Sequence, residues 1–278
     1  MRSTAIPRRP DPAALVRIPL LVALATTLTS TGRVRADSYS PDRFEIEVYD
    51  SETAPPGTTG IELHVNSALV GSKGVSASGE LPSNQVVHLT FEPHLGVTDY
   101  LELGLYLQVA LRPDGLFDYG GVKQRVKLRL PRRVAGFGFA INFEISEVPT
   151  TYEANGLGSE IRPVIDFRWR RLYASVNPIV GIDLAGPLAG KPQFEPAAKL
   201  SVTAFRNFDL GLEYYGALGP LNSESGIAPL GNQTQRLFAV IDASFAIAGV
   251  PFNINAGGGY GFAGDDRWIA KAILGVGH

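Results

Sequence analysis

The clearest pattern in the chain is a strict alternation of apolar and other residues between Leu101 and Leu111. The apolar set fills every second position, at Leu101, Leu103, Leu105, Leu107, Val109 and Leu111. Successive side chains of a strand point to opposite faces, so this pattern predicts one apolar face and one mixed face. The stretch is longer than an average soluble strand of about five or six residues, and it matches the roughly 9–11 residues of a strand that crosses a bilayer at a tilt.

The same period of two recurs in eleven further stretches. They are residues 60–70, 86–97, 121–131, 137–146, 160–169, 172–184, 194–205, 208–218, 236–247, 252–262 and 267–277. Short turns and longer loops mostly alternate between these stretches, as they do in outer-membrane barrels. The sequence therefore predicts an all-β fold, a transmembrane antiparallel up-and-down β-barrel over residues 60–278, of about 12 strands with 14 as the alternative. A soluble β-sandwich or lipocalin-like barrel is the competing fold, but its strands would be shorter and its apolar face would point inward.

Residues 1–36 are predicted to be a cleaved signal peptide. Arginines precede an apolar run at Ile18–Ala25, which is too short to cross a bilayer as a helix, and the predicted cut follows Ala36. Residues 37–59 contain an alternating stretch at Phe44–Tyr49. An additional strand there would have to begin outside the cell, so residues 37–59 are expected to be a periplasmic N-terminal tail or a short extra strand.

Composition narrows the classes of protein that fit this pattern. The 278 residues include no cysteine, which excludes disulfide scaffolds, cysteine metal sites and thiol nucleophiles. The formal charge is -2, and removal of residues 1–36 leaves 19 basic and 26 acidic residues, a charge of -7. Such a chain offers no electrostatic footprint for nucleic acid. We expect a monomer in the outer membrane of a Gram-negative-type bacterium, with the lipid bilayer and the outer-membrane assembly machinery as partners and without a cofactor.

The mixed face of the strands is predicted to line the lumen. One strand carries a basic ladder, formed by Lys123, Arg125, Lys127 and Arg129. Hairpin geometry pairs Glu102 with Arg129 and Glu144 with Lys123 in approximate register. Two interpretations stay open: cross-strand ion pairs that fill a narrow lumen, or a constriction that prefers anions.

Three histidines, His64, His88 and His94, are also predicted to face the lumen. Folding residues 60–97 as a hairpin places His64 near Thr90 and Glu92. A histidine beside a carboxylate can bind a divalent metal, but a hydrogen-bonded lumen network is the commoner arrangement, so no metal site is predicted.

Parts of the chain resemble a known family. The segments are Phe44-Glu-Ile-Glu-Val-Tyr-Asp50, Gly60-Ile-Glu-Leu-His-Val-Asn66 and a longer one that includes Thr98-Asp-Tyr-Leu-Glu-Leu-Gly104. They are similar to the outer-membrane transporter family named after the meta-pathway of phenol degradation, best over residues 44–108. The resemblance implies a barrel that moves small solutes, aromatic ones among them, and it supplies no catalytic or binding residues.

These observations favour a narrow passive channel or transporter for small, aromatic or anionic solutes, without enzymatic activity. A plugged structural or adhesive barrel stays open, because the sequence does not give the width of the lumen. A lipid-modifying hydrolase built on serine and histidine is the second alternative. Against it, His64 and Ser67 are an odd number of positions apart and so point to opposite faces of their strand.

Overall fold

The computed structural model describes residues 42–186, 189–221 and 227–277. The predicted signal peptide, residues 1–36, and residues 37–41 of the predicted tail lie outside this range. The described chain contains one short 3-10 helix, η1 (Leu230–Asn232), and no helix in it is long and apolar enough to span a membrane.

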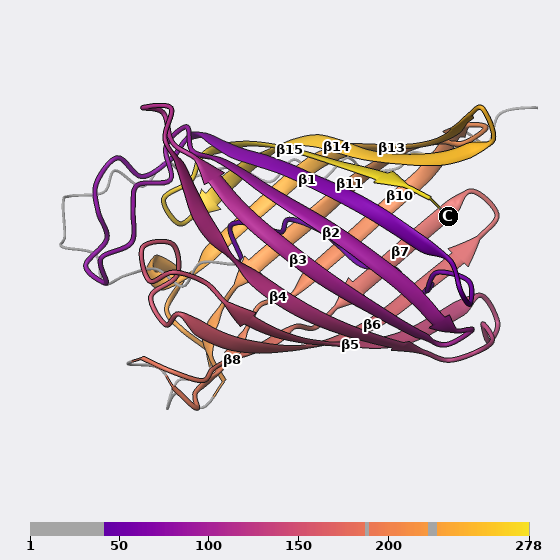
Figure 1. Cartoon of the computed structure of the whole chain (residues 1–278), viewed down its shortest axis with the longest axis horizontal. Helices are drawn as coiled ribbons and strands as arrows, with labels where there is room; N and C mark the ends of the chain where they lie inside the picture. Colours follow the sequence, from indigo (N-terminus) through magenta and orange to yellow (C-terminus); the bar gives the residue numbers. More distant parts are fainter. Residues whose placement is uncertain (1–41, 187–188, 222–226, 278) are drawn as a thin grey trace, which may run out of the picture. The chain divides into compact units, whose positions relative to one another are not determined.

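The described chain is dominated by one closed antiparallel sheet (Figure 1). Its strands are β1 (Thr59–Val70), β2 (Val87–Thr98), β3 (Leu101–Leu111), β4 (Phe117–Arg129), β5 (Phe137–Glu147), β6 (Leu157–Trp169), β7 (Leu172–Asn177), β8 (Val180–Asp183), β9 (Pro192–Phe194), β10 (Ala197–Phe205), β11 (Phe208–Ala217), β12 (Gly219–Pro220), β13 (Thr234–Ile247), β14 (Val250–Ala263) and β15 (Trp268–Val276). The sheet closes because β15 pairs with β1, where Leu63 lies opposite Leu274.

The strand segments form a barrel of 12 strands, which confirms the predicted fold and not the 14-strand alternative. Three of the strands are interrupted, between β7 and β8, between β9 and β10, and between β11 and β12. Pro178 lies in the first break and Pro196 in the second. Proline has no N–H to donate to a neighbouring strand, which weakens the pairing at these two positions.

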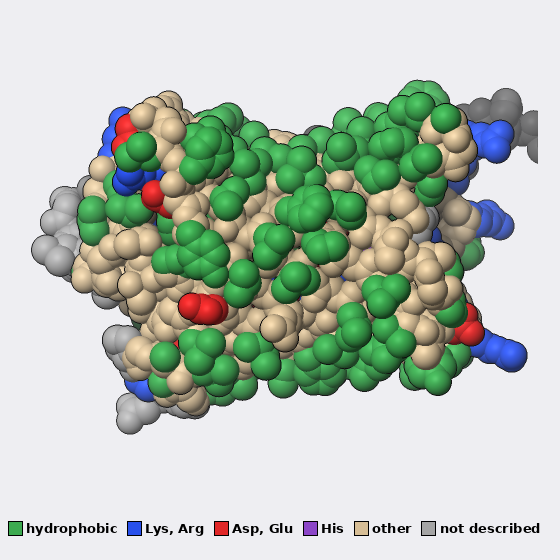
Figure 2. Space-filling model, in the orientation of Figure 1, with side chains coloured by type: hydrophobic (Ala, Val, Ile, Leu, Met, Phe, Trp, Pro, Cys, Tyr) green, Lys and Arg blue, Asp and Glu red, His purple; other side chains and the backbone are tan. Residues whose placement is uncertain are grey.

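Many large hydrophobic side chains are exposed on the outside of the barrel. Figure 2 shows them in green across the face in view, with the red and blue charged groups mostly near the two ends. On β3, Leu103, Leu105 and Leu107 are about two-fifths exposed, whereas Glu102 and Tyr106 on the opposite face are buried. The alternation predicted from the sequence therefore puts apolar side chains outward. A soluble protein rarely leaves so large an apolar surface in water, whereas membrane barrels present one to lipid.

The barrel interior contains residues 42–56, here called the inner segment, which precede β1. Arg43 donates a hydrogen bond to the Leu81 carbonyl (3.2 Å) in the long loop between β1 and β2. At the other end, the Gly57 N–H donates to the Gly96 carbonyl (2.7 Å), near the short turn between β2 and β3. The segment therefore runs through the barrel from the long-loop rim to the short-turn rim, and part of its indigo trace is visible in Figure 1.

The described part of residues 37–59 thus differs from the expected periplasmic tail or extra strand. Residues 44–54 have no strand assignment. The backbone N–H groups of Phe44 and Glu52 bond to carboxylates within the segment, whereas others bond to side chains of the wall. Three such bonds run from Tyr49 to Asn177 Oδ1 (2.7 Å), from Ser51 to Asp166 Oδ2 (2.6 Å) and from Ala54 to Glu102 Oε2 (2.6 Å). The acceptors lie on β7, β6 and β3, so the wall surrounds the segment.

Candidate functional site

The basic ladder of β4 faces the inner segment. Three of its four cations pair with carboxylates of that segment: Lys123 with Asp42 and Glu45, Lys127 with Asp50, and Arg129 with Glu52. Residue numbers in these pairs rise together along β4 and along the inner segment, in the direction from the long-loop rim to the short-turn rim. Because Lys123 and Lys127 are buried, each cation needs its carboxylate partner to offset the loss of water. The acidic segment and the basic ladder are therefore complementary along the barrel.

The remaining cation of the ladder, Arg125, pairs with the wall. Its Nη2 lies 2.7 Å from Glu92 Oε1 and 2.7 Å from Glu102 Oε1. The predicted pairing of Glu102 with Arg129 is wrong, because the register places Glu102 opposite Lys127, and Arg129 contacts the inner segment.

Glu144 of β5 is buried beside the same ladder. Its Oε2 lies 3.5 Å from Lys123 Nζ, which confirms the predicted proximity. Its other oxygen accepts a hydrogen bond from Asn142 (2.6 Å). Lys123 thus joins carboxylates of the wall and of the inner segment.

Tyr49 connects the inner segment to several strands. Its hydroxyl is hydrogen-bonded to that of Tyr106, a fully buried residue of β3. The Arg162 guanidinium lies 4.2 Å from the centre of the Tyr49 ring. The Lys127 ammonium lies 5.4 Å from the same centre, and the Arg125 guanidinium lies 5.5 Å from it. Cations at these distances over an aromatic face are attracted to it. Tyr49 is therefore fixed in the middle of the lumen.

Inward-facing glycines of the wall make room for the inner segment. A Cβ atom at Gly96 would overlap the carbonyl oxygens of Ala54 and Pro55. One at Gly120 would overlap the ring of Phe44. At these positions only a glycine allows the wall and the segment to approach so closely.

The three predicted lumen histidines lie in different surroundings. His64 is opposite Thr90 in the register, and its Nε2 lies 3.1 Å from Glu92 Oε2, which confirms their predicted proximity. His88 packs edge-on against Phe44, with ring centres 4.8 Å apart. His94 lines the cavity described next.

A cavity of about 500 Å³ lies between the inner segment and the short-turn rim. Tyr49 and Glu47 of the segment line it, and so do Arg170 and Arg171 in the turn after β6. The described lining residues include nine acidic and six basic side chains, with Arg125 and Lys127 among the basic ones. The cavity is therefore polar, and its described lining has more acidic than basic side chains while the segment is in place.

The sequence interpretation missed the acidic residues of the inner segment as partners of the ladder. The charge pattern of the sequence could have indicated this pairing. Five acidic residues fall within eleven positions, and the ladder carries four cations on alternate positions; the acidic residues are Asp42, Glu45, Glu47, Asp50 and Glu52.

The sequence interpretation also missed a second ion-pair cluster across the lumen. There Glu213 contacts Lys271 and lies 3.0 Å from Lys199.

No protein family and no curated protein matches the sequence. Solved structures do resemble it. An outer-membrane channel from Pseudomonas putida F1 has a TM-score of 0.53 at 11% identity, over 84% of this chain and 100% of that one. The NanC porin gives 0.49 at 8% identity, over 78% and 98%, and LpxR from Salmonella typhimurium gives 0.42 at 8%, over 78% and 99%. The first of these likenesses identifies the fold of the chain as one that an outer-membrane channel also has.

Proposed function

We propose that the chain is a narrow passive channel for small solutes in the outer membrane of a Gram-negative-type bacterium, and that the inner segment forms its constriction. The observation that carries this proposal is the polar cavity of about 500 Å³ that leads from the short-turn rim to the inner segment. Charged and polar side chains that line such a passage favour hydrated or polar solutes over lipid.

The proposed solutes are small, and the state of the inner segment determines which charge they carry. With the segment in place, the acidic excess of the cavity disfavours anions. If the segment moves, the ladder loses its carboxylate partners and the lumen becomes more basic, which favours anions. The resemblance of residues 44–108 to the phenol meta-pathway transporter family adds aromatic molecules to the proposed solutes.

A plugged barrel without transport is the second candidate, and the inner segment itself favours it. The segment is bonded to the wall from Arg43 to Ala54, so a lumen that never opens is consistent with these contacts. The two functions differ in one measurable property, the passage of ions through the folded barrel.

Single-channel conductance of the refolded chain in a planar bilayer tests the proposal. We expect discrete current steps that disappear when the protein is denatured before addition. Insertion is checked separately by the faster gel mobility of an unboiled barrel. An inserted barrel without current steps would contradict the channel and support the plugged structure.

A lipid-modifying hydrolase remains the enzymatic alternative. We propose no such activity, because His64 is buried against three glutamates and Ser67 lies on the other face of β1. A lipase assay in detergent with calcium is expected to give no turnover. Release of fatty acid that is lost in a His64→Ala protein would overturn this expectation.

A further inference from the structure

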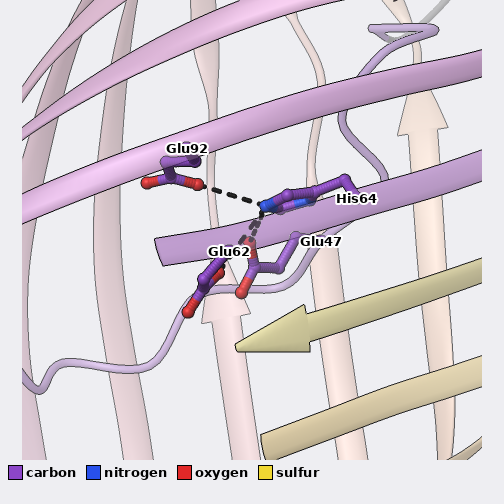
Figure 3. Close-up of side chains that lie close together, drawn as sticks. All are labelled: Glu47, Glu62, His64 and Glu92. Carbon is purple, nitrogen blue, oxygen red and sulfur yellow. Dashed lines mark hydrogen bonds and ion pairs between the residues drawn. The ribbon is translucent and has the colours of Figure 1, made fainter. Parts of the chain in front are cut away.

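Figure 3 shows four side chains that converge between the inner segment and the wall. Glu47 comes from the inner segment, Glu62 and His64 from β1, and Glu92 from β2. His64 Nε2 lies 3.1 Å from Glu92 Oε2, 3.6 Å from Glu62 Oε2 and 4.0 Å from Glu47 Oε2. One ligand atom from each residue lies within 4.8 Å of all the others.

Two carboxylates of this cluster, Glu47 and Glu62, do not have the lysine or arginine partner that several other lumen carboxylates have in the described part of the chain. Glu45, Glu102 and Glu213 each lie within ion-pair distance of a lysine or arginine. For Glu47 and Glu62, the ion-pair partner among the described residues is His64 alone. Three carboxylates thus share one imidazole, with Arg125 on the far oxygen of Glu92. A further positive charge would stabilise this arrangement.

The cluster is also accessible and partly preorganised. Glu47 and Glu62 are about one-quarter exposed and line the cavity that reaches the short-turn rim, so an ion has a path to them. Glu92 and His64 lie buried behind them. Arg125 holds Glu92 by a 2.7 Å contact, as residues behind a metal site commonly hold a ligand carboxylate.

We propose that Glu47, Glu62, His64 and Glu92 bind one divalent transition-metal ion. One imidazole nitrogen and three carboxylate oxygens suit zinc or manganese, whereas calcium and magnesium prefer oxygen ligands alone. Ligand atoms of a tetrahedral zinc site are about 3.4 Å apart, so ligand atoms that now lie as far as 4.8 Å from one another need to close by up to about 1.4 Å. Rotation of the two carboxylates at the cavity supplies this movement.

The ion would link the inner segment to the wall, because Glu47 is on the segment and the other three ligands are on β1 and β2. This part of the inference rests on the proposed channel function. The bound ion would then hold the inner segment against the wall and so keep the constriction in place. Zinc is then expected to lower the conductance of the folded barrel, and to do so only while Glu47 is present.

Calorimetric titration of the folded full chain with Zn²⁺ at neutral pH tests the site without any reference to transport. We expect one ion per chain, and a loss of affinity of roughly tenfold or more in Glu62→Gln and His64→Ala proteins. His88→Ala is the matched control, because His88 is another buried lumen histidine and packs on Phe44 instead of the cluster. Glu62→Gln keeps the shape of the side chain, so it remains informative if His64→Ala does not fold.

Hydrogen exchange of residues 44–54 tests whether the ion links the inner segment to the wall. Saturating Zn²⁺ is expected to slow exchange in the unaltered chain and to have no such effect in a Glu47→Gln protein, which retains three ligands. Absence of saturable Zn²⁺ binding, or equal binding by the His64→Ala and His88→Ala proteins, would overturn the site. Slowing of exchange in the Glu47→Gln protein would contradict a link between the inner segment and the wall through Glu47.

The metal site and the channel can fail separately. A barrel that conducts but binds no Zn²⁺ contradicts the site and leaves the channel intact. A barrel that binds one Zn²⁺ through these ligands but shows no current contradicts the channel and leaves the site intact.

Discussion

At the scale of single residues, glycine decides how closely wall and inner segment approach. Gly96 points into the barrel from β2, and the carbonyl oxygens of Ala54 and Pro55 occupy the space that any other side chain would need. These are backbone atoms, which cannot rotate away as the end of a flexible side chain can. Gly258 on β14 offers the opposite case, because a Cβ atom there would meet nothing within 4 Å.

We therefore predict opposite outcomes for two identical substitutions. Gly96→Ala should lower the free energy of unfolding by about 1–3 kcal/mol, the usual effect of overpacking, and should raise conductance by displacing the segment. Gly258→Ala should change the free energy of unfolding by less than about 1 kcal/mol and leave conductance unaltered. Denaturant unfolding in micelles and bilayer recording measure both. Equal behaviour of the two proteins would show that the segment is not pressed against β2.

At the scale of elements, the twelve strands could be predicted from the sequence and the position of the inner segment could not. A wall strand shows its alternation locally, as in Leu101–Leu111, because one face meets lipid throughout. The inner segment alternates too, from Phe44 to Tyr49, and so resembles a strand. What distinguishes it is where its N–H groups bond, for example Tyr49 to Asn177, and that partner is 128 residues away. The pairing of its carboxylates with Lys127 and Arg129 likewise depends on the folded barrel.

Neutralising the segment should release it from the ladder. The variant is Asp42→Asn, Asp50→Asn and Glu52→Gln, which leaves Lys127 and Arg129 without their segment partners. We expect larger single-channel conductance and a reversal potential shifted toward anion preference, because the cations of the ladder then face the lumen. Reversal potentials in a salt gradient measure the shift.

A variant matched in residue types provides the control for this experiment. It is Asp99→Asn, Asp114→Asn and Glu147→Gln, three exposed carboxylates outside the inner segment. It removes the same charge from the chain and is expected to keep the original conductance and selectivity. If both variants shift alike, net charge and not the segment sets selectivity.

At the scale of the whole molecule, polarity is reversed relative to a soluble protein. Leucines such as Leu105 are outside, and charged side chains such as Arg125 and Glu213 are buried within. This reversal was predictable, since strands of 11 or more residues with one apolar face fit a bilayer better than a soluble core. The filling of the lumen was not, because the sequence gives no measure of its width.

The reversed polarity predicts how position determines the effect of an added charge. Leu105→Arg, in the middle of β3, should lower the free energy of unfolding in lipid by about 2–4 kcal/mol. Leu116→Arg, in the loop between β3 and β4, should lower it by no more than about 1 kcal/mol, although Leu116 is more exposed. Denaturant titration in lipid vesicles, followed by gel mobility, measures both. An equal cost at the two positions would argue against a bilayer around β3.

The passage of the inner segment also determines the sidedness of the molecule. An even set of wall strands starts and finishes at one rim, so the beginning of β1 lies beside Val276 at the short-turn rim. The additional pass through the lumen carries the chain back to Asp42 on the side of the other rim, where Arg43 bonds to Leu81 of the long loop. Probes attached at Asp42 and at Val276 will therefore report from opposite faces of the membrane, and a reagent that cannot cross it will reach only one of them.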